Sequence, residues 1–98
     1  MSQPLDGIFV LDLSRALAGP YCSMMLADMG ATVLKIEQPG VGDTARSWGP
    51  PFQAGESSYF LSVNRNKQSM ALNLRDARGT EILRRLVAQS DVLLEKFV

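Results

Sequence analysis

The chain has 98 residues, of which 46% are hydrophobic, and its ten acidic and ten basic side chains cancel. This size and composition predict one globular domain with a modest core. Neither sign of charge gathers into a block, which argues against nucleic acid or a membrane surface as a partner. No apolar run reaches the roughly 20 residues that span a bilayer. With a single cysteine and no signal or transit pattern, we expect a cytoplasmic protein without a disulfide.

The sequence contains no histidine. Within these residues this excludes Ser-His-Asp and Cys-His catalytic arrangements and every mixed Cys/His zinc site. Any chemistry that the segment performs alone must therefore use carboxylates, Lys, Arg, Tyr or Ser. Cys22 stands on the apolar stripe of an expected helix and has no base beside it, so we interpret it as a core residue.

The first half of the chain predicts a βαβ unit. Residues 8–13 form a nearly continuous apolar run, which is typical of a strand covered on both faces. A helix is expected from Pro20 to Gly30, because apolar residues then recur at helical spacing: Cys22, Met25, Leu26 and Met29. The β-branched run 31–37 predicts a second strand, parallel to the first because a helix separates the two.

The second half predicts a long loop and a second βαβ unit. Residues 38–58 are rich in Gly, Pro and Ser and form the loop, while residues 59–68 fit either a short helix or an extended segment. Residues 69–74 predict a third strand, and Asp76 is expected to cap a helix. The apolar side of that helix consists of Gly79, Ile82, Leu83, Leu86 and Val87. Residues 92–98 predict a fourth strand that lacks a crossover helix, so we expect the incomplete N-terminal part of a larger α/β domain.

Open α/β sheets bind ligands beyond the carboxyl ends of their strands. Four segments are expected at that edge: residues 14–19, 38–43, 75–76 and 96–98. A dinucleotide is one candidate ligand, because Glu37 stands where a ribose-binding acid would. However, the first loop lacks the G-x-G-x-x-G pattern that cradles a pyrophosphate, which disfavours this interpretation.

Other features admit both a functional and an ordinary structural interpretation. The glycine-containing segment 39–43 with Arg46 could contact a phosphate or form a surface turn. Asp12, within an apolar strand, is a candidate for a shifted pKa or an acceptor for a neighbouring loop. Trp48 and Phe52 could stack on a base or anchor a lid. Four basic side chains could bind an anion or lie on a solvated face: Arg65, Lys67, Arg75 and Arg78.

Three stretches resemble the amino-terminal part of the class III CoA-transferases of the CaiB/BaiF type. They are "PLDGIFVLDLSRALAGPYCSMMLADMGATVLKIEQPGVGD", "SYFLSVNRNKQSMALNL" and "SDVLLEKF". The segment "GDTARSWGPPFQAGESSYFLSVNRNK" is most similar to enzymes of this family that move CoA between dicarboxylic acids. The related acyl-CoA racemases share the fold but typically have a shorter connection here, so the long loop favours a transferase.

The resemblance implies a Rossmann-like parallel sheet in which residues 1–98 are the CoA-binding segment. The implied substrates are an acyl-CoA and a carboxylic acid, so coenzyme A is a substrate and no cofactor is bound permanently. Family members form interlocked homodimers, and their catalytic Asp lies beyond the position of Val98. The 98-residue chain alone is therefore expected to be inactive. Three alternatives stay open: a racemase-type relative, a non-catalytic CoA- or nucleotide-binding module, and an interaction protein that pairs through its last strand.

The resemblance also implies which positions contact CoA: Ala16, Leu17, Ala18, Gln38, Leu72, Asn73, Leu74, Arg75, Lys96 and Phe97. Two of them depart from the family pattern. Gln38 occupies a position that is often Arg, and Lys96 replaces an Asn. We expect no catalytic residue and no metal ligand within this chain.

Overall fold

The computed structural model describes residues 2–95. The main sheet is formed by β1 (Phe9–Asp12), β2 (Thr32–Glu37), β5 (Gln68–Ala71) and β6 (Val92–Leu94). Two long helices accompany it, α1 (Ala18–Asp28) and α3 (Ala77–Gln89). The connection between β2 and β5 holds four short elements: η1 (Thr44–Ser47), β3 (Phe52–Gln53), β4 (Glu56–Ser57) and α2 (Ser58–Ser62).

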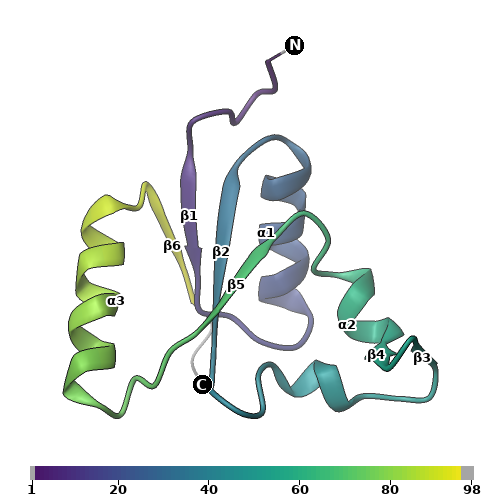
Figure 1. Cartoon of the computed structure of the whole chain (residues 1–98). Helices are drawn as coiled ribbons and strands as arrows, with labels where there is room; N and C mark the ends of the chain where they lie inside the picture. Colours follow the sequence, from purple (N-terminus) through teal and green to yellow (C-terminus); the bar gives the residue numbers. More distant parts are fainter. Residues whose placement is uncertain (1, 96–98) are drawn as a thin grey trace.

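The strands of the main sheet are all parallel and lie in the order β5-β2-β1-β6 (Figure 1). The chain therefore adds strands outward from β1 to β5 and then returns through α3 to the other side of β1. This order is the first part of a doubly wound sheet, in which the direction of winding reverses beside the first strand. The expected α/β fold with βαβ units is confirmed.

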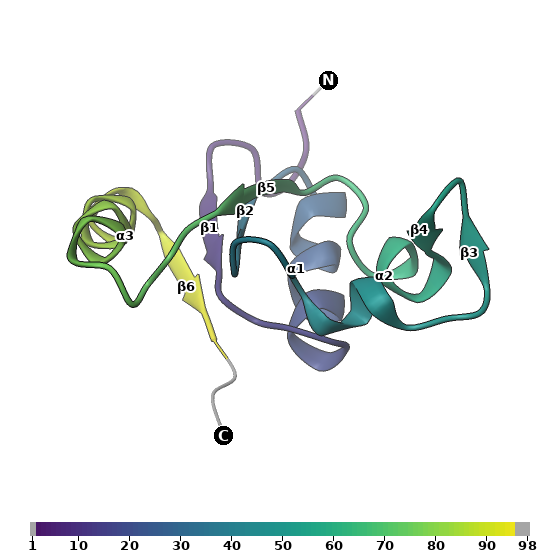
Figure 2. The same cartoon turned by 60° about the horizontal axis from the view of Figure 1, so that its bottom comes forward.

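The helices α1 and α3 cover opposite faces of the sheet, because successive strand residues point to opposite sides. Val10 and Val33 pack with Ala27 and Ala31 on the face covered by α1. Leu11, on the other face, belongs to a second core cluster, which contacts α3; that cluster is Leu11, Ile36 and Leu72, with Leu83 and Leu86 packed against it. Figure 2 shows the two helices on either side of the strands.

The connection from β2 to β5 forms a lobe beside α1 rather than one unstructured loop (Figure 2). Its aromatic side chains hold it together. The rings of Trp48 and Tyr59 meet edge to face with centroids 4.7 Å apart, and the Arg46 guanidinium lies 3.9 Å from the centre of the Phe60 ring. The segment that fitted either a helix or an extended chain contains the short helix α2 and then leads into β5.

Local sequence rules predict two helix ends correctly. Gly30 follows α1 with φ of +106°, a backbone conformation that glycine adopts without steric cost. Asp76 caps α3, and its side chain accepts a hydrogen bond from the Arg78 N–H.

The expected start of α1 is wrong, and its expected buried face is right only at Leu26, which packs against the core. The helix begins at Ala18, and Pro20 fits within the first turn because its missing N–H would have no intrahelical partner there. Met25 and Met29 of the expected stripe are exposed, and Cys22 is only half-buried rather than in the core. The buried residues of α1 are instead Gly19, Pro20, Ser23, Met24 and Ala27. The cause is polar, since the Ser23 hydroxyl donates to the buried Asp12.

Two other expectations need correction. The strand β5 ends at Ala71, earlier than the expected Leu74. On α3, Gly79 is buried, but Ile82 and Val87 remain exposed. The described part of the last strand covers Val92–Leu94. No helix among residues 2–95 has both the length and the apolar character needed to cross a membrane.

Candidate functional site

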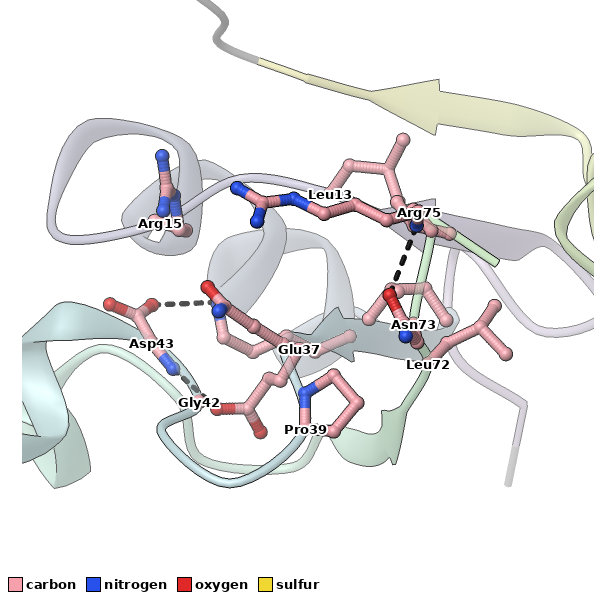
Figure 3. Close-up of a pocket in the computed structure, with 13 residues that line it drawn as sticks. Leu13, Arg15, Glu37, Pro39, Gly42, Asp43, Leu72, Asn73 and Arg75 are labelled. Atoms are coloured by element: carbon pink, nitrogen blue, oxygen red, sulfur yellow. Dashed lines mark hydrogen bonds and ion pairs between the residues drawn. The ribbon is translucent and has the colours of Figure 1, made fainter. Parts of the chain in front are cut away.

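The carboxyl ends of β1, β2 and β5 border an open cavity of about 200 Å³ (Figure 3). The residues that line it are Leu13, Arg15, Lys35, Ile36, Glu37, Gln38, Pro39, Gly42, Asp43, Leu72, Asn73, Leu74 and Arg75. This is the edge of the sheet at which α/β folds bind ligands. Pockets that enclose a whole small molecule measure about 300 to 1,000 Å³, so this cavity fits one part of a larger ligand.

The pocket has apolar walls and a polar rim. Leucine and isoleucine side chains from the strand ends form the walls: Leu13, Ile36, Leu72 and Leu74. On the rim, the side-chain oxygen of Asn73 accepts a hydrogen bond from the Arg75 N–H at 3.0 Å, which fixes the turn after β5. The Leu72 N–H donates to the Glu37 carbonyl at 2.9 Å and so ties this turn to the end of β2. The walls suit a flat apolar group, and the rim suits polar substituents on it.

Two exposed arginines lie on the rim of the pocket. Arg15 and Arg75 are exposed, and within residues 2–95 neither has a carboxylate partner. In Figure 3 they lie with Leu13 along one side of the pocket, opposite Gly42 and Pro39. A guanidinium group binds phosphate through paired hydrogen bonds, so this side of the pocket is suited to a phosphorylated ligand.

A buried ion pair supports the loops behind these arginines. The Lys35 ammonium lies 2.8 Å from the Asp43 carboxylate and donates to the Ser14 carbonyl at 2.8 Å; the two side chains are 2% and 0% exposed. The Asp43 carboxylate also accepts from the N–H groups of Ala16 and Ala45. Burial raises the pKa of Asp43, but the hydrogen bonds from Lys35 and these N–H groups outweigh it and lower that pKa. Asp43 thus remains a buried anion that joins the loop after β1 to the loop after β2.

The carboxylate of Glu37, at the end of β2, also accepts hydrogen bonds from several protein groups. Its two carboxylate oxygens accept from the Arg46 guanidinium at 2.6 and 2.8 Å, and it accepts further bonds from the Ser69 hydroxyl and the Asp43 N–H. Burial raises the pKa of Glu37, but these donors together lower it to about 2. Since its oxygens are occupied by the protein, Glu37 is not available to a ribose hydroxyl. The dinucleotide interpretation loses its one supporting residue.

Asp12 is a structural acceptor. Its carboxylate is fully buried and accepts hydrogen bonds from the Ser14 N–H at 2.8 Å, the Ser14 hydroxyl, and the Ser23 hydroxyl at 2.6 Å. The Lys67 ammonium lies 3.5 Å away. Of the two interpretations of Asp12, the structure therefore supports an acceptor that holds the neighbouring loop.

The four basic residues considered from the sequence do not form one anion site. Burial lowers the pKa of Lys67 to about 8, although the nearby Asp12 acts in the opposite direction. Arg65 pairs with Asp28, and Arg78 bonds to its own helix cap. Of these four side chains, only that of Arg75 lines the pocket.

The pocket brings together five of the residues expected to contact CoA: Gln38, Leu72, Asn73, Leu74 and Arg75. Ala16, Leu17 and Ala18 lie in the adjoining turn and helix start and do not line it. Lys96 and Phe97 lie outside the described residues. Within the described chain, no group of three or more His, Cys, Asp or Glu side chains could hold a metal ion.

The sequence interpretation did not single out Arg15, Lys35 or Asp43, although Asp43 belongs to the candidate segment 39–43. A signal for Lys35 was present, because a lysine inside the apolar run of a buried strand requires a buried partner. Arg15 stood in the loop singled out at the end of the first strand, but nothing in the local pattern distinguished it from an ordinary surface arginine.

Comparison with known proteins identifies relatives of this arrangement. Residues 5–98 match the family described as CoA-transferase family III. The chain is 56% identical over 96 residues to a Mus musculus succinyl-CoA:glutarate CoA-transferase, covering 98% of this chain and 22% of that protein. It is 47% identical over 100 residues to an Agrobacterium fabrum succinate–glutarate CoA-transferase, covering 96% of this chain and 25% of that protein.

A solved structure agrees with these sequence matches. The crystal structure of a CaiB/BaiF family protein from Brucella suis superimposes with a TM-score of 0.92 at 44% identity. The match covers 99% of this chain and 26% of that one, so the chain spans about a quarter of the length of the relatives it matches. Sequence and fold agree over nearly every residue, and the chain belongs to CoA-transferase family III, the CaiB/BaiF family.

Proposed function

We propose that residues 1–98 form the CoA-binding N-terminal segment of an enzyme that moves CoA from an acyl-CoA to a carboxylic acid. The observation that carries the proposal is the pocket at the carboxyl edge of the sheet, where apolar walls adjoin Arg75, whose guanidinium has no carboxylate partner among residues 2–95. CoA combines a flat base with phosphate groups, and the pocket offers a surface suited to each. The base packs between the leucines of the walls, and a phosphate group binds Arg75.

The reaction proposed for the full chain proceeds through an aspartyl intermediate. A carboxylate outside residues 1–98 attacks the thioester carbonyl, so that a mixed anhydride forms and CoA leaves as a thiolate. The thiolate then attacks the aspartyl carbonyl, which gives an aspartyl-CoA thioester and releases the first acid. The acceptor acid repeats these two steps in reverse order and leaves with CoA. An anhydride retains the energy of the thioester, which hydrolysis would lose.

The substrates proposed are dicarboxylic. Two relatives that match over nearly the whole of this chain are named for succinyl-CoA or succinate and for glutarate. We therefore propose succinyl-CoA as donor and a short dicarboxylic acid as acceptor. By the same family resemblance, we propose a homodimer. The single cysteine supports the further proposal of a reducing, cytoplasmic compartment.

Calorimetry and a transfer assay test this function. The full chain that carries these residues is titrated with CoA and with NAD, and glutaryl-CoA is measured after incubation with succinyl-CoA and glutarate. We expect CoA to bind more tightly than NAD, and glutaryl-CoA to form. In the Arg75→Gln variant, CoA should bind about tenfold more weakly, the loss of about one charged hydrogen bond. Tighter binding of NAD would contradict the proposal.

The matched control for Arg75→Gln is Arg85→Gln, which removes the same charge from an exposed site on α3 that does not line the pocket. It should leave CoA binding unchanged. Binding of CoA without transfer to any acid would favour a non-catalytic module, and epimerisation of a 2-methylacyl-CoA would favour a racemase.

A further inference from the structure

Lys35 and Asp43 form hydrogen bonds with the backbone on both sides of Arg15. The Lys35 ammonium holds the Ser14 carbonyl at 2.8 Å, and the Asp43 carboxylate holds the Ala16 N–H at 3.0 and 3.2 Å. Between these two attachments stands Arg15, whose side chain lines the pocket. The backbone that carries this exposed arginine is therefore fixed by a pair of charges that are almost entirely buried.

The backbone conformation of the turn at residues 14–16 is unfavourable by itself. Ala16 has φ of +72°, in the left-handed region that is sterically unfavourable for an alanine. Such a conformation persists only where surrounding contacts hold it. The contact that holds the Ala16 N–H comes from Asp43, which Lys35 neutralises. The turn and the direction of Arg15 thus depend on one ion pair.

We propose that the Lys35–Asp43 pair is a positioning pair, which holds Arg15 at the pocket so that its guanidinium binds a phosphate group of CoA. This inference rests on the proposed function. Neither Lys35 nor Asp43 contacts the ligand in this proposal; both act through Arg15. A buried ion pair contributes little net stability, but it fixes geometry, which is the role it has here.

The first test removes the guanidinium. Affinity of the full chain for CoA and for dephospho-CoA, which lacks the 3′-phosphate, is measured for Arg15→Gln, with Arg85→Gln as the matched exposed control. We expect Arg15→Gln to weaken CoA binding about tenfold and the control to change nothing. A loss seen with CoA alone assigns Arg15 to the 3′-phosphate, and a loss with both ligands assigns it to the diphosphate; either result supports the proposal.

The second test is a double-mutant cycle between the pair and Arg15. Asp43→Asn should weaken CoA binding about fivefold to tenfold in the native background and hardly at all in the Arg15→Gln background. Lys35→Gln should behave in the same way and serves where Asp43→Asn does not fold, as judged by circular dichroism. A role in general stability alone would lower affinity in both backgrounds by the same factor, so that outcome overturns the proposal.

Failure of this inference and failure of the proposed function look different. Native protein that binds no CoA overturns the proposed function and this inference with it. Native protein that binds CoA while Arg15→Gln binds both ligands equally well overturns only the positioning role.

Discussion

The half of the sheet that borders the pocket and the half formed by β6 and α3 are stabilised in opposite ways. Around β1 and β2, charged side chains are buried and paired: Asp12, Lys35 and Asp43 are at most 2% exposed. On α3 and β6, apolar side chains face outward: Ile82, Val87, Val92 and Leu93 are 39% to 46% exposed. The pocket half therefore buries charges that are paired among the described residues, whereas the other half leaves these four apolar side chains exposed.

Paired buried charges and apolar packing restrict the geometry of the loops to different degrees. Apolar packing tolerates small shifts, whereas a buried charge with defined donors does not, because an unpaired buried charge is very costly. We therefore expect the loops of the pocket to be preformed and rigid. The following substitutions test the contrast between the pocket half and the α3–β6 half.

The largest effect is expected from Asp12→Ala. This change removes the carboxylate that accepts from Ser14 and Ser23 and that lies 3.5 Å from the buried Lys67 ammonium, which should cost about 4 kcal/mol. Lys67 then keeps only neutral acceptors, the Pro20 carbonyl and the Asn64 side chain. The matched aspartate in the other half is Asp91, which is exposed and accepts from the Phe9 N–H at 2.8 Å. Because water can replace it, Asp91→Ala should cost about 1 kcal/mol. Urea unfolding measures both, and equal losses would remove the contrast between the two halves.

The two halves should also differ in the cost of truncating an apolar residue. Leu11 is 0% exposed on the sheet face toward α3, so Leu11→Ala should lower the free energy of unfolding by about 3 kcal/mol. Ile82 is 43% exposed on α3, so Ile82→Ala should cost about 1 kcal/mol or less. Urea unfolding measures both changes. A loss of unfolding free energy at Ile82 similar to that at Leu11 would show that the Ile82 side chain is covered in the folded protein.

Much of the fold could be predicted from the sequence because it rests on local signals. The apolar runs of β1 and β2, the glycine after α1 and the cap of α3 each depend on residues within one turn or strand. The buried face of α1 could not, because Ser23 is buried by an acceptor on β1 rather than by its own apolarity. Hydrophobic spacing carries no information about such a partner.

The candidate site likewise has features that the sequence predicts and features that it does not. Its strand-end position follows from the general behaviour of parallel sheets, and five of its lining residues follow from the family resemblance. The partners in the ion pairs could not be predicted, since each pair joins a strand residue to a residue outside that strand. Lys67, for example, meets Asp12 across 55 positions of sequence. Only the folded chain brings such charges within reach of each other.

Acid should weaken the pocket half through Glu37. Its pKa is lowered from 4.5 to about 2 in the folded protein, so the ionised carboxylate stabilises the fold fully above pH 4.5. That contribution, about 3 kcal/mol, is lost as the pH falls from 4.5 to 2. The measurement is the free energy of unfolding across this window for the native protein and for Glu37→Gln. The two curves should converge toward pH 2, and parallel curves would show that Glu37 contributes nothing to the acid sensitivity.

The smallest effect concerns the helix caps, where the two halves again differ. Asp76 caps α3 with a 2.8 Å hydrogen bond from the Arg78 N–H, so Asp76→Ala should cost about 1 kcal/mol in urea unfolding. At the start of α1, Leu17 makes no side-chain cap, and its ψ of −64° differs from the extended backbone that a capping side chain needs. Leu17→Asp should therefore gain no measurable stability. A gain as large as the loss at Asp76 would mean that the turn beside Arg15 rearranges easily, which is the opposite of a rigid, preformed pocket.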